Sequence, residues 1–363
     1  MPAPICIMPS TLSLRCATVL SIIALSTVAS LAQGTLTPPG APAPVMKTLS
    51  QIEPRTLISS LPVTLTNGGS YYLSNNLRGV SGGSGITIAT NNVSIDLNGF
   101  ALIGVPGSLK GIVTGSTLNN ITVRNGAISD WGGGGFDGFG AGPLRNGIIE
   151  NLTVSSNGGY GMIISGHCLI RGCLSQSNTL DGISCYYSVV SDCVVKDNGG
   201  YGFTAYNCHL SHCVAQNSSA SGIYASLSDV QDCKALNCVN GIYVLSGRVS
   251  NCSAQNNTYS GIYVDGPGSI VTGNLVTGNN ATANNVNAGI TIRDSNNRVE
   301  GNQVNNNGFA GILALTPYTG NVIIKNTVAG SGANNYLVPT PANDLGPVGK
   351  AATATSPWAN ISN

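Results

Sequence analysis

The stretch VVSDCVVKDNGGYGFTAY, residues 189–206, is the clearest copy of a unit that recurs along this chain. It contains three short runs in which apolar and polar residues alternate, separated by turn formers such as Asp192, Asn198 and Gly199. Alternation with a period of two is typical of β-strands, and no part of this unit has helical periodicity. The unit therefore predicts one coil of three short strands, unlike a leucine-rich repeat or a propeller blade.

The unit recurs at a nearly constant step. A glycine followed by an apolar residue returns at intervals of 21, 20, 20, 19 and 20 residues, with looser copies at Gly289 and Gly311. The regular copies begin at Gly161, Gly182, Gly202, Gly222, Gly241 and Gly261. Because paired strands lie about 4.8 Å apart, each strand can pair with its counterpart one coil later. We therefore expect an all-β, single-domain, three-sided parallel β-helix, or solenoid.

Aligned copies place equivalent residues in columns. Two apolar columns, which pass through Val190 and Val195, are expected to point inward and form a narrow core. A third column contains Cys173, Cys193, Cys213, Cys233 and Cys252, and continues as Asn274, Asn302 and Asn326. Stacked Asn amides can hydrogen-bond to one another, and Cys fills the same space as a small apolar residue. This column predicts an inward ladder at the turn between the second and third strands.

Nine cysteines follow the N-terminal segment, and we expect buried free thiols. Side chains that point the same way on successive coils lie near the outer limit of disulfide geometry, although bridges remain the alternative in an exported protein. His167, His209 and His212 each lie beside a cysteine. The column of Cys168 and Cys208, however, would separate these two thiols by about 9.6 Å, too far for one zinc ion. We predict no metal site and no cofactor.

The two ends of the chain differ from the repeats. Arg15, an apolar run over 16–28 and the small residues around Ala32 are typical of a secretion signal, with an uncleaved anchor as the alternative. A Pro-rich linker and a short helix over 47–58 would follow. The expected boundaries are a signal at 1–32, a linker at 33–46, an N-terminal cap at 47–62, the β-helix at 63–338 and a capping tail at 339–363.

These features resemble the right-handed parallel β-helix repeat proteins of the pectate-lyase-like superfamily. The resemblance rests on the Gly-Ile steps, the inward ladder at Cys193 and Asn302, and the stretch VSIDLNG at residues 93–99. It covers about residues 60–340 and implies a right-handed helix, but it implies little about activity, because the repeat only builds the scaffold. In polysaccharide-active relatives the binding groove lies along the first strand, which follows the Gly-Ile step.

Two outward columns on the first strands carry a run of tyrosines. These carbohydrate-binding candidates, here called the tyrosine row, occupy five consecutive coils and are Tyr186, Tyr206, Tyr224, Tyr243 and Tyr263. An aromatic ring with a hydroxyl group suits flat contact with a sugar ring. The alternative is ordinary strand composition, because tyrosine favours strands and stacks on itself. Two insertions, Trp131–Gly142 and Thr277–Ala288, are expected in the turn before the first strand, where they could wall a groove.

The first-strand face is poor in acids and bases. A lyase or epimerase needs a base, an acid and a cation, and a glycosidase needs two placed carboxylates. The face offers only weak catalytic candidates, Asp137, Asp265 and Arg293. The column of Asp192, His212 and Asp232 could polarise a base, but it adjoins the second turn and is expected to be a solvated surface ladder.

We therefore expect an exported β-helix, secreted or at the cell surface, or periplasmic, that is non-catalytic and either carbohydrate-associated or structural. Its expected partner is a polysaccharide or cell-surface glycan. The alternative is a polysaccharide lyase, epimerase or hydrolase that acts on uronate-type polymers through a divergent site. A net charge of +1 gives no reason to expect nucleic acid, and no membrane span is expected once the signal is removed.

Overall fold

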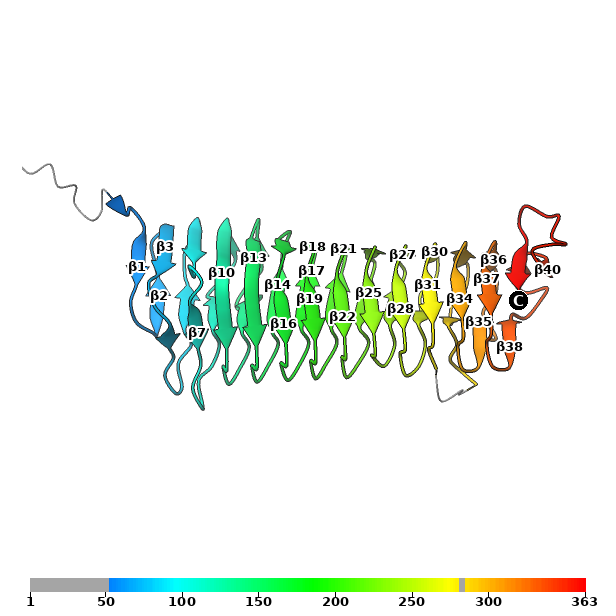
Figure 1. Cartoon of the computed structure of the whole chain (residues 1–363). Helices are drawn as coiled ribbons and strands as arrows, with labels where there is room; N and C mark the ends of the chain where they lie inside the picture. Colours follow the sequence, from blue (N-terminus) through cyan, green and yellow to red (C-terminus); the bar gives the residue numbers. More distant parts are fainter. Residues whose placement is uncertain (1–51, 281–284) are drawn as a thin grey trace, which may run out of the picture. The chain divides into compact units, whose positions relative to one another are not determined.

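The computed structural model describes residues 52–280 and 285–363. The expected signal at 1–32 and linker at 33–46 lie outside the described residues. Residues Glu53–Asn363 form one compact unit, a parallel β-helix whose coils stack side by side (Figure 1). Within the described ranges, no helix has the length and apolar character needed to cross a bilayer.

The first strands of 13 coils form one parallel sheet, here called sheet 1. Its strands are β2 (Val63–Leu65), β5 (Ile86–Ile88), β8 (Ile112–Thr114), β11 (Phe136–Gly138), β14 (Met162–Ser165), β17 (Ile183–Tyr186), β20 (Phe203–Tyr206), β23 (Ile223–Ser226), β26 (Ile242–Leu245), β29 (Ile262–Val264), β32 (Ile290–Ile292), β35 (Ala310–Ala314) and β38 (Asn334–Leu337).

The second and third strands form a 26-stranded parallel system, here called sheet 2. Its second strands are β1 (Thr56–Ile58), β3 (Gly69–Leu73), β6 (Val93–Asp96), β10 (Ile121–Ser129), β13 (Ile148–Ser155), β15 (Leu169–Arg171), β18 (Val189–Ser191), β21 (His209–Ser211), β24 (Asp229–Gln231), β27 (Arg248–Ser250), β30 (Ile270–Thr272), β33 (Arg298–Glu300), β36 (Val322–Ile324) and β39 (Asp344–Leu345). β10 and β13 are long enough to run on into the third side.

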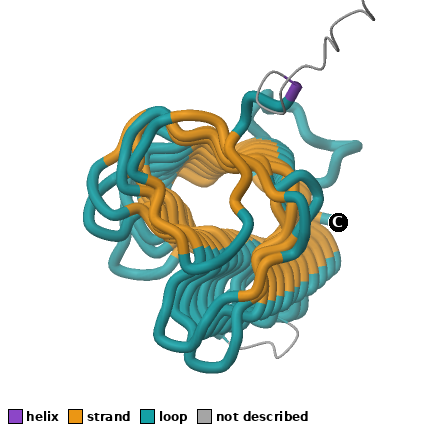
Figure 2. The backbone as a smooth tube through the Cα atoms, turned by 90° about the vertical axis from the view of Figure 1, so that its left-hand side faces the viewer, coloured by secondary structure: helices purple, strands orange, loops and turns teal. Residues whose placement is uncertain are grey.

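The separate third strands are β4 (Leu77–Arg78), β7 (Ala101–Ile103), β16 (Leu174–Gln176), β19 (Val194–Lys196), β22 (Val214–Gln216), β25 (Lys234–Leu236), β28 (Ser253–Gln255), β31 (Leu275–Thr277), β34 (Gln303–Asn305), β37 (Thr327–Ala329) and β41 (Asn360–Ser362). β40 (Val348–Gly349) pairs with β41, and a small third sheet joins β9 (Leu118–Asn119) to β12 (Leu144–Arg145). Figure 2, which looks along the stack, shows the strands of successive coils superimposed around a common axis.

The core consists of identical positions stacked coil on coil. Val190 pairs in register with Ile170 and Leu210, and Val195 pairs with Ser175 and Ala215. All six side chains are fully buried. The two predicted inward columns are therefore confirmed.

The predicted Cys-to-Asn ladder is confirmed, and two more ladders accompany it. Each coil has turn 1 between its first and second strands, turn 2 between its second and third, and turn 3 into the next coil. At turn 2 the Cys213 N–H donates to Cys233 Sγ at 3.4 Å, and the Asn274 N–H donates to Asn302 Oδ1 at 2.9 Å. The nine cysteines are all buried free thiols, and burial raises the pKa of Cys168 to about 11.

The two additional ladders use the same bond at the other turns. At turn 3 the Asn178 N–H donates to Asn198 Oδ1 at 3.0 Å, and at turn 1 the Cys208 N–H donates to Ser228 Oγ at 2.9 Å. A ladder at each turn satisfies backbone N–H groups that the strands leave unpaired inside the coil. Hydrogen-bonded side-chain ladders therefore stabilise all three edges of the solenoid from the inside.

The solenoid reaches beyond the expected bounds of 63–338. Residues 53–55 are not helical and residues 56–58 form β1, which pairs with β3, so the helix expected over 47–58 is wrong over residues 53–58. In the tail, β39 pairs with β36 and β41 pairs with β37. Asn360 continues the turn-2 ladder by accepting from the Asn326 N–H at 3.0 Å. The C-terminal tail thus builds strands onto the last coil.

Candidate functional site

Sheet 1 carries the tyrosine row as a continuous series of rings in contact. Register places Tyr224, Tyr243 and Tyr263 in one outward column, and Tyr186 and Tyr206 in the next. Ring centroids lie 5.0 Å apart for Tyr186 and Tyr206, 5.7 Å for Tyr206 and Tyr224, 5.2 Å for Tyr224 and Tyr243, and 5.1 Å for Tyr243 and Tyr263. The structure thus brings all five predicted tyrosines together.

Stacking determines which part of each ring a ligand can reach. Three of the four successive pairs are stacked, at interplanar angles of 5°, 25° and 28°, and all five side chains are half-buried. The ring faces are therefore turned toward neighbouring rings, which leaves edges and hydroxyl groups for solvent. Burial raises the pKa of Tyr224 to about 12, so the hydroxyl stays protonated at neutral pH. The row can donate hydrogen bonds more readily than it can offer the flat ring faces expected from the sequence.

Arg293 and Asp265 close one end of the row. Arg293 Nη1 donates to the Tyr263 hydroxyl at 3.2 Å, and its Nε lies 3.9 Å from Asp265 Oδ1. Tyr243 donates to the same carboxylate. Burial is the main cause of a raised pKa of Tyr243, and this hydrogen bond to Asp265 raises the pKa further. A phenol held in its protonated form is a poor general base, so this cluster orients groups more readily than it abstracts protons.

The glycine-rich loop differs from its expected position. Its middle, Phe136–Gly138, is strand β11 of sheet 1, and Phe136 is fully buried. Gly135-Phe136 is in fact another copy of the Gly-apolar step. The extra residues of this coil therefore lie after the first strand, in turn 1. Trp131 is also buried, and its Nε1 donates to the Leu102 carbonyl at 3.2 Å, so it supports the core and walls no groove.

Phe139, which follows β11, extends the tyrosine row at the other end. Its ring lies 5.6 Å from Tyr186 and is 46% exposed, and it reaches over the coil that carries the small Ser165. The second expected insertion, Thr277–Ala288, lies between β31 and β32, but residues 281–284 are outside the described ranges.

Asp137 lies beside Phe139 in an ion pair with Lys110. Burial alone would raise the pKa of Asp137, but hydrogen bonds from Lys110 and from the N–H groups of Gly140 and Phe139 outweigh it and lower the pKa. These groups border a pocket of about 310 Å³ whose other lining residues include Tyr160 and Ile163. Asp137 is thus a neutralised anion, and it is separated along the row from Asp265.

Asp181 is an acid on this face that the sequence reasoning missed. It is half-buried and accepts hydrogen bonds from Thr204 Oγ1 at 2.8 Å and from the Tyr201 N–H at 2.9 Å. Burial raises its pKa despite these bonds. Asp181 sits in turn 3, immediately before a Gly-Ile step, and turn residues fall outside the strand columns. The sequence signal available for Asp181 was its position immediately before Gly182.

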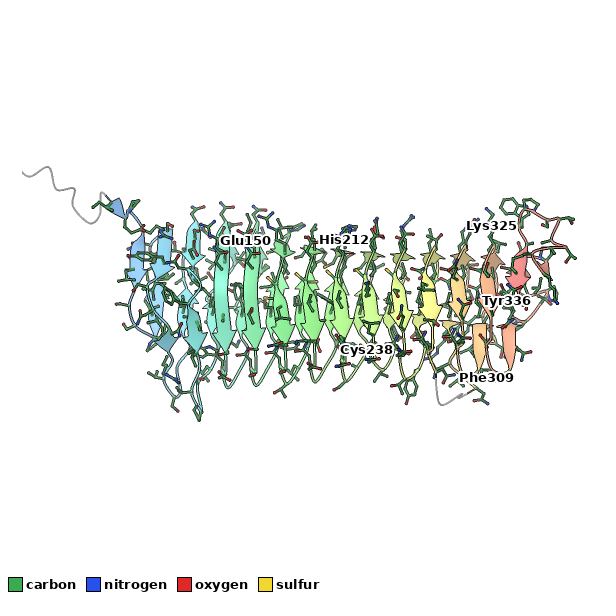
Figure 3. The ribbon with its side chains drawn as sticks, in the orientation of Figure 1. Glu150, His212, Cys238, Phe309, Lys325 and Tyr336 are labelled. Carbon is green, nitrogen blue, oxygen red and sulfur yellow. The ribbon has the colours of Figure 1, made fainter. Side chains whose placement is uncertain are left out.

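The Asp-His-Asp column lies elsewhere. Asp192, His212 and Asp232 occupy turn 2 with φ of 55°, 54° and 53°, and Lys325 fills the same position with φ of 56°. Figure 3 shows His212 and Lys325 on one edge of the solenoid and Cys238, a turn-3 residue, on the other. This left-handed conformation explains why Gly, Asn and Asp dominate the column. Among the described residues, no group of three or more His, Cys, Asp or Glu side chains could hold a metal ion.

We expect His212→Ala to leave glycan binding unchanged and to alter the free energy of unfolding by less than about 0.5 kcal/mol. His212 Nε2 lies 3.9 Å from Asp232 Oδ2, and the His212 side chain is 64% exposed. Thermal unfolding monitored by circular dichroism measures the effect. A drop of several degrees in the midpoint would contradict the surface-ladder interpretation.

The comparison with known proteins agrees with this architecture. The model of the family described as "Right handed beta helix region" matches residues 62–231 and 225–335. No curated protein sequence matches this chain significantly.

Solved structures share the fold at low sequence identity. The A-module of mannuronan C-5 epimerase AlgE4 from Azotobacter vinelandii superimposes with a TM-score of 0.63 at 19% identity, covering 76% of this chain and 90% of that one. The AlgE6 A-module of the same organism gives 0.65 at 19% identity, covering 82% and 91%. The receptor-binding protein of bacteriophage Det7, a podoviral tailspike, gives 0.51 at 11% identity, covering 83% and 73%.

Proposed function

Because this chain belongs to the family of right-handed β-helix proteins, we propose that it binds a polysaccharide along sheet 1 without cleaving it. The observation that carries the proposal is the continuous series of ring contacts on five consecutive coils, lengthened by Phe139. A polysaccharide chain laid along the stack would meet one hydroxyl per coil, about 4.8 Å apart. The names of the similar solved structures, epimerases of mannuronan and a phage receptor-binding protein, also support a glycan ligand.

The state of the ionisable groups supports binding over catalysis. Asp137 is paired with Lys110, and Arg293 is shared between Tyr263 and Asp265. A lyase or epimerase needs a base that accepts a proton near neutral pH, whereas Tyr243 has a raised pKa. Release of cleaved or epimerised product from a uronate polymer, lost on Asp265→Ala, would establish the enzyme alternative instead.

We expect the double variant Tyr206→Phe, Tyr224→Phe to weaken glycan binding about tenfold, because two hydrogen bonds contribute roughly 1.4 kcal/mol to binding. Tyr206 and Tyr224 are neighbours in the row, and the pKa of Tyr224 is raised in part by Tyr206, so the double variant removes two adjacent hydroxyls together. The rings remain, and so does their stacking. A glycan array identifies the ligand, titration calorimetry measures its affinity, and mass analysis of the recovered polymer tests for cleavage.

Tyr72→Phe provides the matched control. Tyr72 is a half-buried tyrosine on β3 of sheet 2, where Arg55 covers its ring at 4.7 Å. Its hydroxyl is not part of the row, so the affinity should not change. Equal affinities for the wild-type chain and the double variant would exclude the row as the binding surface.

We further propose that the protein is exported, and that segment 1–32 is removed in the process. This proposal rests on the apolar run over 16–28 and the small residues that follow it. N-terminal sequencing of the protein recovered outside the cytoplasm should begin at Gln33. Recovery of the uncleaved chain from the membrane fraction would favour an anchor.

A further inference from the structure

We infer that the polysaccharide bound by sheet 1 is neutral rather than a polyuronate. This inference rests on the proposed function and specifies its ligand class. It comes from the charges along the five coils that carry the tyrosine row. In these coils, which extend from β17 to β29, turn 1, the first strand and turn 3 contain no Lys or Arg.

Two anions border the tyrosine row, Asp181 and Asp265, and neither is paired with a Lys or Arg of these five coils. Asp181 has hydrogen-bond donors in Thr204 and Tyr201, but the described residues offer it no ion pair. Asp265 lies 3.9 Å from Arg293, which belongs to the following coil. A polymer with one carboxylate per sugar would therefore be repelled by Asp181 at the β17 end of the row and would gain no salt bridge along the five coils.

The cations at the two ends do not change this balance. Lys110 already pairs with Asp137, and Arg293 already contacts Asp265 and Tyr263. Arg145 lies in turn 1 of the β11 coil, beside His167 and Tyr187, at the border of a different pocket. A carboxylate that leaves water without a cationic partner raises the free energy of the complex, whereas sugar hydroxyls can exchange hydrogen bonds with the tyrosines. Neutral sugars therefore match the row.

A matched pair of ligands tests the inference: polygalacturonate and its carboxyl-reduced, neutral form, examined together with a panel of neutral and acidic polysaccharides by affinity electrophoresis of the full chain. We expect the protein to bind at least one neutral polysaccharide of the panel. Its affinity for that polysaccharide should change less than about twofold between 20 mM and 500 mM salt, because no charge pairs form. Acidic polysaccharides in the gel should not retard the protein.

The double variant Asp181→Asn, Asp265→Asn sharpens the test, because it removes both anions and leaves Arg293 free to pair. It should gain at least about tenfold in affinity for polyuronates. Tighter binding of polygalacturonate than of its reduced form by the wild-type chain would overturn the inference and leave the proposed function intact. Failure to bind any polymer on the panel would overturn the proposed function itself.

Discussion

Gly241→Ala is expected to destabilise the solenoid by at least about 3 kcal/mol, because the new methyl group would overlap the next coil. A Cβ at Gly241 would lie 2.5 Å from the Gly261 carbonyl oxygen and 2.7 Å from Asn257 Nδ2. The oxygen belongs to backbone that pairs in register with β26, so it cannot move away without separating two coils. The glycine of the Gly-Ile step is thus required by close approach of the backbone.

Chemical denaturation monitored by far-ultraviolet circular dichroism measures this effect. Gly115→Ala is the matched control, because its Cβ would meet nothing nearer than the Ile88 carbonyl oxygen at 3.6 Å. That variant should unfold within about 0.5 kcal/mol of the wild-type protein. If the two variants unfold at the same denaturant concentration, the coils do not pack as closely as described.

Asn302→Ala is expected to lower the free energy of unfolding by about 4 kcal/mol, because it deletes the centre of a buried hydrogen-bond chain. Asn302 Oδ1 accepts from both the N–H and the Nδ2 of Asn274, each at 2.9 Å. Asn302 Nδ2 donates to the Val271 carbonyl at 3.0 Å and to Asn326 Oδ1 at 2.9 Å. Alanine removes all four bonds and leaves the Asn274 N–H without its acceptor.

Two further variants separate the ladder from general perturbation of this strand. Asn302→Cys should lose about half as much stability, since a thiol accepts the same backbone bond earlier in the column, where the Cys213 N–H meets Cys233 Sγ. Gln303→Ala, on the exposed neighbouring residue, should change stability by less than about 0.5 kcal/mol. Equal losses for Asn302→Ala and Gln303→Ala would contradict the ladder's structural role.

The repeat allowed the fold to be predicted because each coil imposes the same packing requirement on the same position. Val190 and Cys193 could be assigned to the interior, since their columns hold the same kinds of residue coil after coil. The ladders at turns 1 and 3 were missed because their columns are chemically mixed: Ser228 alternates with Cys208, and Ser218 interrupts the Asn series. Asn157, Asn178 and Asn198, spaced by one coil, were the available signal at turn 3.

The site could be predicted only as far as the strands extend. Register placed the tyrosine row correctly, because outward positions follow from the inward ones. The partners of Asp137 and Asp181 could not be predicted, since Lys110 and Tyr201 lie in turns whose side-chain directions are not set by strand alternation. The column of Asp192, His212 and Asp232 resembled a catalytic cluster in the sequence, but its composition reflects a left-handed turn conformation.

A crystal structure of the full chain with the best-binding neutral oligosaccharide would show whether sheet 1 is the binding surface. We expect sugar residues laid along sheet 1, with hydroxyl groups of Tyr206, Tyr224 and Tyr243 within hydrogen-bond distance of the ligand and an intact glycosidic chain. Density for the ligand elsewhere, such as in the pocket of about 410 Å³ beside Trp358 and Arg298, with the tyrosine row bare, would contradict it.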